Sequence, residues 1–125
     1  MTKILVVDDD DKSRELLEDF LENRGYNVIT ASSGKEALQK IRESPAIVLL
    51  DIMMPDMHGL KVLDEIKERA PSTEVIMVTS FDEHAVSVEC MKRGAADFLI
   101  KPIDLKYLET LLNFKELQGL IKDKS

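Results

Sequence analysis

Short apolar runs alternate five times with longer amphipathic stretches along this chain. The apolar runs predict strands over residues 3–7, 27–31, 47–51, 74–79 and 97–101. Apolar residues spaced three and four apart predict helices between them. These helices are expected over 11–24, 34–43, 60–70 and 83–93, with a last one after Asp104. The order of elements is therefore five strand–helix units.

The inward faces and the ends of these helices follow from the same pattern. Ser33, Asp82 and Asp104 are expected to cap helices, and Gly25, Pro71 and Gly94 to end them. The core-facing positions are expected to be Leu16, Leu17, Phe20 and Leu21, then Ala37, Leu38 and Ile41, then Leu60, Leu63 and Ile66, and finally Leu105, Leu108, Leu111 and Leu112.

Continuously apolar strands are typical of a parallel sheet that is buried on both faces. Five βα units with short loops predict a doubly wound, flavodoxin-like (βα)5 sandwich with helices on both faces of the sheet. The strand order 2-1-3-4-5 places the first and third strands side by side at the topological switch point. The carboxyl ends of those strands are then the expected place for chemistry.

Four of the five apolar runs end at a residue that can take part in chemistry. Asp8 and Asp9 follow the first run, Asp51 the third, Thr79 the fourth and Lys101 the fifth. Parallel neighbours would bring three carboxylates, a hydroxyl and an ammonium into one small cleft. Carboxylates packed so closely need neutralisation, and their oxygens suit Mg²⁺. An aspartate at such a place can act as a nucleophile toward phosphorus.

Composition narrows the possible functions. The 125 residues carry a net charge of −7, which argues against nucleic-acid binding by this domain itself. The longest apolar stretch is about six residues, whereas a membrane span needs roughly 20, and no signal-peptide region opens the chain. Cys90 is the one cysteine and is expected to serve packing, while His58 and His84 are expected at the surface. A cytoplasmic protein of one domain is the simplest interpretation.

Together these residues resemble the receiver domain of two-component response regulators, the CheY-like superfamily. The resemblance covers about residues 3–115. The matching pieces are Val7-Asp8-Asp9, Asp51 with Pro55 and Gly59 after it, Val78-Thr79-Ser80, and Lys101-Pro102.

The resemblance implies a role for each position of the site. Asp51 would be the phosphoacceptor, supplied by the phosphohistidine of a sensor histidine kinase, by a phosphotransfer protein or by a small donor such as acetyl phosphate. Asp9 would bind Mg²⁺ (or Mn²⁺) directly and Asp8 mainly through water, with Asp51 and the backbone carbonyl of Met53 completing the ligands. Thr79 and Lys101 would bind phosphoryl oxygens.

The same resemblance implies three further features. The Lys101–Pro102 peptide is expected to be cis. Phe98 falls at the switch aromatic, which with Thr79 would couple the site to the face of the fourth helix, fifth strand and fifth helix. Met53 and Phe81, both large and apolar, border the approach to the phosphoryl group. We expect them to exclude water and to slow the loss of phosphate.

Residues 116–125 leave two accounts open: an extension of the last helix, or the start of a linker to an effector domain. In the extension, Leu117, Leu120 and Ile121 would continue the apolar stripe. A stand-alone receiver that docks to a target is equally consistent, and a phosphorylation-dependent homodimer is a further possibility.

Three other classes of function fit the sequence less well than a receiver. A phosphatase with an aspartyl nucleophile usually has a second acid two residues later, where Met53 stands. A flavodoxin-like cofactor domain would need a phosphate loop in place of the acidic run 8–11. A degenerate receiver would lack site residues that are all present here.

Overall fold

The computed structural model describes residues 2–80 and 84–119, and over these ranges five parallel strands form one sheet. The strands are β1 (Lys3–Val7), β2 (Asn27–Ala31), β3 (Ile47–Asp51), β4 (Glu74–Thr79) and β5 (Asp97–Ile100). Their order in space is β2-β1-β3-β4-β5, which confirms the predicted doubly wound topology. The parallel register pairs Val7 with Leu50 and Asp51 with Val78, so the carboxyl ends of β1, β3 and β4 meet at one edge.

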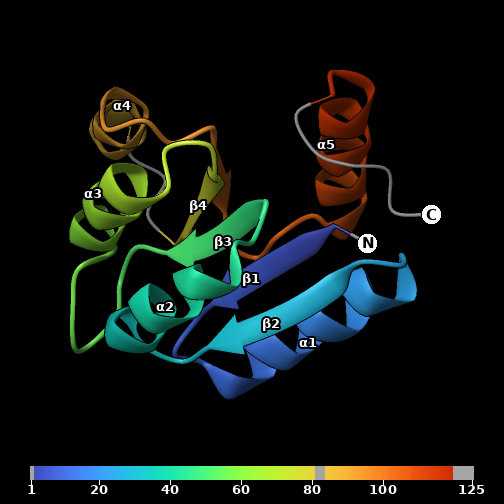
Figure 1. The fold of residues 1–125 in the computed structure, drawn as a ribbon, viewed down its shortest axis with the longest axis horizontal. Helices are drawn as coiled ribbons and strands as arrows, with labels where there is room; N and C mark the ends of the chain where they lie inside the picture. The colour runs from blue at the N-terminus through green and yellow to red at the C-terminus, as the bar shows by residue number, and fades with distance from the viewer. Residues whose placement is uncertain (1, 81–83, 120–125) are drawn as a thin grey trace.

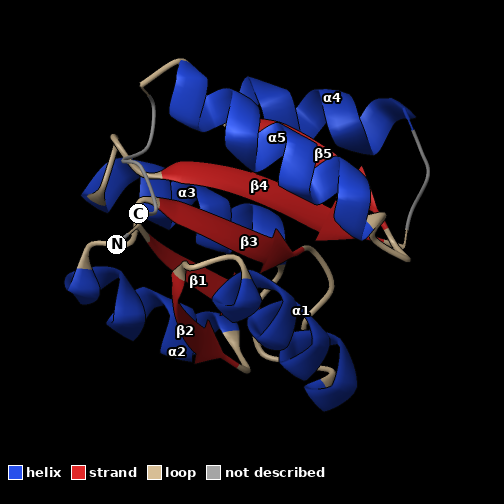
Figure 2. Ribbon diagram, turned by 90° about the vertical axis from the view of Figure 1, so that its right-hand side faces the viewer, coloured by secondary structure: helices blue, strands red, loops and turns tan. Residues whose placement is uncertain are grey.

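Helices cover both faces of this sheet (Figures 1 and 2). They are α1 (Asp11–Asn23), α2 (Gly34–Lys40), α3 (Gly59–Arg69), α4 (His84–Lys92) and α5 (Leu105–Leu117). Side chains of α1 and α5, such as Leu21 and Leu108, pack on one face of the sheet. Those of α2, α3 and α4, such as Ala37, Leu63 and Cys90, pack on the other. Alternate residues of each buried strand thus enter two separate cores, as a doubly wound fold requires.

Polar caps fix where several helices begin. Asp10 accepts a hydrogen bond from the amide of Lys12 at the start of α1, and Ser33 and Asp104 cap α2 and α5 as predicted. Gly25 and Gly94 follow α1 and α4 with φ of 90° and 96°, a backbone conformation that side chains with a Cβ rarely adopt. The predicted cap Asp82 lies outside the described residues.

Some expectations about helix faces and boundaries were wrong. Leu16 is 58% exposed, because the buried face of α1 is narrower than the predicted stripe and is built on Leu17 and Leu21. Leu117 is 87% exposed, so it does not extend the core face of α5, while Leu120 and Ile121 lie outside the described residues. Residues 41–43, predicted as α-helix, form a tighter 3₁₀ turn before Ser44, which has a φ of 56°.

One ion pair joins α5 to the beginning of β4. The ammonium of Lys115 lies 2.9 Å from a carboxylate oxygen of Glu74, and the Lys115 side chain is only 7% exposed. The face of α5 that packs on the sheet is therefore apolar except for Lys115, whose buried charge is paired with that of Glu74.

Cys90 lies in α4 and is fully buried against the sheet. Burial raises the pKa of its thiol, since the thiolate would be poorly solvated there. The predicted packing role is consistent with this position. Among the helices of the described ranges, none is long and apolar enough to cross a membrane.

Candidate functional site

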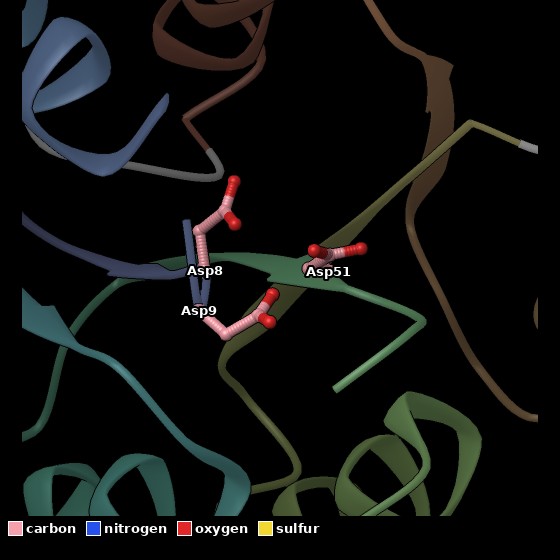
Figure 3. Close-up of side chains that lie close together, drawn as sticks. All are labelled: Asp8, Asp9 and Asp51. Carbon is pink, nitrogen blue, oxygen red and sulfur yellow. The ribbon is translucent and has the colours of Figure 1, made fainter. Parts of the chain in front are cut away.

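Three carboxylates gather where β1 and β3 end (Figure 3). One oxygen each of Asp8, Asp9 and Asp51 can be chosen so that all lie within 4.8 Å of one another. Asp8 and Asp51 are 2% and 6% exposed, while Asp9 is open to solvent. The pairing of β1 with β3 brings them together, as the strand order predicted.

Lys101 reaches this cluster from the residue after β5. Its Nζ atom donates to Asp8 Oδ2 at 2.9 Å and to Asp51 Oδ2 at 3.2 Å. Burial opposes the charge of the ammonium, but the hydrogen bond to Asp8 and the charges of both carboxylates outweigh it and raise the pKa of Lys101. The Lys101–Pro102 peptide is cis, which confirms that expectation.

Asp51 lies in an electrostatically unfavourable position for a carboxylate. Burial, only partly offset by Lys101 and reinforced by the charge of Asp8, raises the pKa of Asp51 above its ordinary value of 3.8. Two of the three carboxylates, Asp8 and Asp51, share the one ammonium, so negative charge remains in excess. A hard divalent cation would relieve that excess, and carboxylate oxygens are ligands that suit Mg²⁺.

Thr79 and Met53 flank the cluster. Thr79 ends β4 and is fully buried, and its carbonyl accepts a hydrogen bond of 2.7 Å from the amide of Lys101. The amide of Met53 donates to Asp51 Oδ1 at 3.3 Å, whereas its side chain is 51% exposed beside the site. Phe98 is half-buried in β5 and packs against the core under α2, α3 and α4. Phe81, also expected here, lies outside the described residues.

The loop of residues 52–58, between β3 and α3, has an anchor that sequence reasoning missed. Asp56 Oδ1 accepts from the amide of Gly34 and Oδ2 from that of Lys35, each at 3.1 Å. These hydrogen bonds lower the pKa of Asp56. The partners are 22 and 21 residues away in sequence, so no local pattern could reveal them.

The loop also ends in close contact with the site. A Cβ at Gly59 would lie 2.5 Å from the carbonyl oxygen of Asp51, so only glycine fits there. His58 is exposed, as expected, and caps α3 by accepting a hydrogen bond from the amide of Leu60. His84 is also exposed.

Comparison with known proteins identifies the family. The model of the response regulator receiver domain matches residues 4–113 of this chain. The transcriptional regulatory protein ZraR of Escherichia coli K12 is 42% identical over 110 residues, 87% of this chain and 25% of that protein. The cyclic di-GMP phosphodiesterase of Thermotoga maritima is 38% identical over 105 residues, 84% of this chain and 28% of that protein. The chain thus spans about a quarter of the length of these relatives.

Solved structures agree with this result. The CheY-like receiver domain protein from Methanospirillum hungatei JF-1 superposes with a TM-score of 0.89 at 31% identity, covering 96% of each chain. The chain belongs to the response-regulator receiver domains of two-component systems, which are signalling domains. The resemblance drawn from its motifs is confirmed.

Proposed function

We propose that this receiver accepts a phosphoryl group on Asp51 from the phosphohistidine of a sensor histidine kinase or a phosphotransfer protein. The observation that carries the proposal is the meeting of three aspartates within 4.8 Å of one another, with the Lys101 ammonium 3.2 Å from Asp51. This is the arrangement that phosphoryl transfer needs, because charge neutralisation and alignment contribute most of its catalysis.

The residues present fit a Mg²⁺ or Mn²⁺ ion. Asp9 and Asp51 would bind it directly, Asp8 mainly through water, and the backbone carbonyl of Met53 would add a neutral oxygen ligand. The bound ion supplies positive charge that offsets the carboxylates and the incoming phosphoryl oxygens. The exposed position of Asp9 and the partial exposure of the cluster leave an approach from solvent.

In the transfer, an oxygen of Asp51 forms the new bond to phosphorus as the bond to the donor imidazole nitrogen breaks. The electron pair of the broken bond stays on the imidazole. Lys101 then exchanges part of its contact with Asp8 and Asp51 for a phosphoryl oxygen. The hydroxyl of Thr79 donates to another of these oxygens. Both groups gain partners that exist only in the phosphorylated state, which can shift a conformational equilibrium.

The output of that shift would be the face formed by α4, β5 and α5. Movement of Thr79 toward the phosphoryl group would let Phe98, now half-buried, pack more deeply. A target protein, an effector domain joined after residues 116–125 or a second copy of the receiver would bind the altered face. The receiver unit in this proposal is 1–115. Slow hydrolysis of the aspartyl phosphate would reset it.

Intact-protein mass spectrometry after incubation with acetyl phosphate and Mg²⁺ tests the acceptor. We expect a gain of one phosphoryl mass in the wild type, and no gain without Mg²⁺ or in Asp51→Asn. A wild type that gains no mass and shows no spectral change with beryllofluoride would contradict the proposal. It would favour a module that binds partners without phosphorylation.

A further inference from the structure

The loop of residues 52–58, which carries Met53, is held to the rest of the domain by several hydrogen bonds. Two of these bonds come from helix α2, which contributes no residue to the site. At its start, the amide of Ile52 donates to the carbonyl of Val78 at 3.0 Å. At its end, the amide of Gly59 donates to the carbonyl of Ile52 at 2.7 Å. Between these points, Asp56 binds the first turn of α2. The two ends of the loop are therefore hydrogen-bonded to each other, and its middle is hydrogen-bonded to α2.

The contact between the loop and α2 is close as well as polar. A Cβ at Gly34 would lie 3.0 Å from the Cβ of Met57 and 2.9 Å from a methyl carbon of Val62. The missing side chain at Gly34 thus lets α2 approach the loop closely enough for the amides of Gly34 and Lys35 to reach the carboxylate of Asp56. Each oxygen of Asp56 takes one amide, so the clamp fixes both position and orientation.

Met53 lies three residues before Asp56 on the same loop. Its side chain is half exposed, so side-chain packing contributes little to holding its backbone. In the residues that follow Met53, the nearest ones fixed by packing or hydrogen bonds are Met54, whose side chain is buried, and Asp56, whose carboxylate is bound by α2. A ligand carbonyl on a loop needs such support, because metal affinity depends on how well its ligands are held.

We propose that Asp56 is a positioning residue that clamps the loop to α2 and so holds the Met53 carbonyl in place for the cation. The inference rests on the metal site of the proposed function. Because coupling between two sites is reciprocal, the cation also stabilises the first turn of α2. The beginning of α2 thereby becomes sensitive to the state of the site, although it contributes no ligand.

The chain offers a matched control. Ser33 caps the same helix by accepting from the amide of Glu36 at 3.1 Å, and that bond makes no link to the loop. Asp56→Ala removes the clamp, Asp56→Asn keeps one acceptor oxygen, and Ser33→Ala weakens only the helix start. Mg²⁺ affinity is measured by isothermal titration calorimetry, with urea unfolding to confirm that each variant is folded.

We expect Asp56→Ala to weaken Mg²⁺ binding about fivefold. Asp56→Asn should have a smaller effect, since its one carbonyl oxygen can still accept a neutral hydrogen bond from one of the two amides. Ser33→Ala loosens the helix start but keeps the link to the loop, so it should weaken binding less than Asp56→Asn does. In the wild type, Mg²⁺ should slow hydrogen exchange at the amides of Gly34 and Lys35, and Asp56→Ala should abolish that effect. Equal affinities in all four proteins would overturn the proposal.

Exchange in metal-free protein separates this inference from the proposed function. Asp56→Ala should speed exchange at the amides of Met53 and Gly59 at least fivefold relative to Ser33→Ala, whether or not Mg²⁺ binds. If the wild type binds no Mg²⁺, the metal assignment fails. Even then, faster hydrogen exchange at Met53 and Gly59 in Asp56→Ala would support the clamp, and unchanged exchange would refute it. Should Asp56→Ala not fold, the same comparison is made with Asp56→Asn.

Discussion

Two lysines are largely buried at opposite ends of the sheet, and they are paired in different ways. Lys115 in α5 meets one carboxylate, that of Glu74 at the amino end of β4, at 2.9 Å. Lys101, at the carboxyl ends of the strands, is shared by Asp8 and Asp51, with Asp9 close by. The pair at the amino end is neutral, whereas the cluster at the carboxyl end keeps an excess of negative charge.

The Lys115–Glu74 pair has the balanced charge of a structural ion pair, whereas the cluster around Lys101 has the unbalanced charge that is typical of a binding site. Over the described residues, no buried polar side-chain atom lacks a hydrogen-bond partner. The carboxyl edge is therefore satisfied in hydrogen bonds and unbalanced only in charge. Such an imbalance lowers stability and provides affinity for a cation, a cost that is typical of functional sites.

Removing the shared lysine should have the largest effect. Lys101→Ala is expected to slow phosphorylation of Asp51 by acetyl phosphate about 100-fold, because a charge that stabilises the transferring group is lost. Initial rates from intact mass check this, with Lys106→Ala, an exposed lysine of α5, as the control. A rate within about twofold of wild type would show that Lys101 does not serve the transfer.

Removing the lysine of the one-to-one pair should affect stability instead. Lys115→Ala leaves Glu74 partly buried without its partner and is expected to lower the free energy of unfolding by about 2 kcal/mol. Urea denaturation measures the loss. The double variant Lys115→Met, Glu74→Leu should recover at least half of it, since both charges are then gone. An unchanged midpoint in the single variant would mean that the pair contributes nothing.

The exposed Met53 side chain beside the site is expected to control the lifetime of the phosphorylated state. Met53→Asn is expected to speed loss of phosphate about tenfold, equivalent to about 1.4 kcal/mol, by admitting water. Phe81→Glu, at a position that the family resemblance puts beside the phosphoryl group, should act in the same direction. Decay is followed by intact mass after the donor is removed. Met91→Asn, on an α4 residue with similar exposure, is the control and should leave the decay unchanged.

The smallest effect is expected from relieving the charge imbalance. Without Mg²⁺ at neutral pH, Asp51→Asn should raise the free energy of unfolding by about 1 kcal/mol, because a carboxylate held by burial at a raised pKa is removed. The gain is full above that raised pKa and is lost as the pH falls toward 3.8. Urea denaturation at several pH values measures it. If the wild type and Asp51→Asn are equally stable at neutral pH, the charge imbalance does not lower the stability of the fold.

Sequence reasoning succeeded where local pattern and topology carry the information. Continuous apolar runs marked the buried strands, and the strand order alone brought Asp8, Asp9 and Asp51 together. It failed where the width of a helix face decides exposure, as at Leu16 and Leu117, which lie at the margin of apolar stripes. It also missed the clamp at Asp56, which depends on how closely the loop of residues 52–58 approaches the first turn of α2 in space.

The buried thiol of Cys90 has a practical consequence for experiments on this protein. It is the chain's single cysteine, it is inaccessible, and burial raises its pKa, which further disfavours the reactive thiolate. Thiol-reactive dyes should therefore leave the folded wild type unlabelled. Cysteines introduced at exposed positions can then carry fluorophores without any change to the native thiol, so that motion of α2 and α4 can be followed separately by fluorescence.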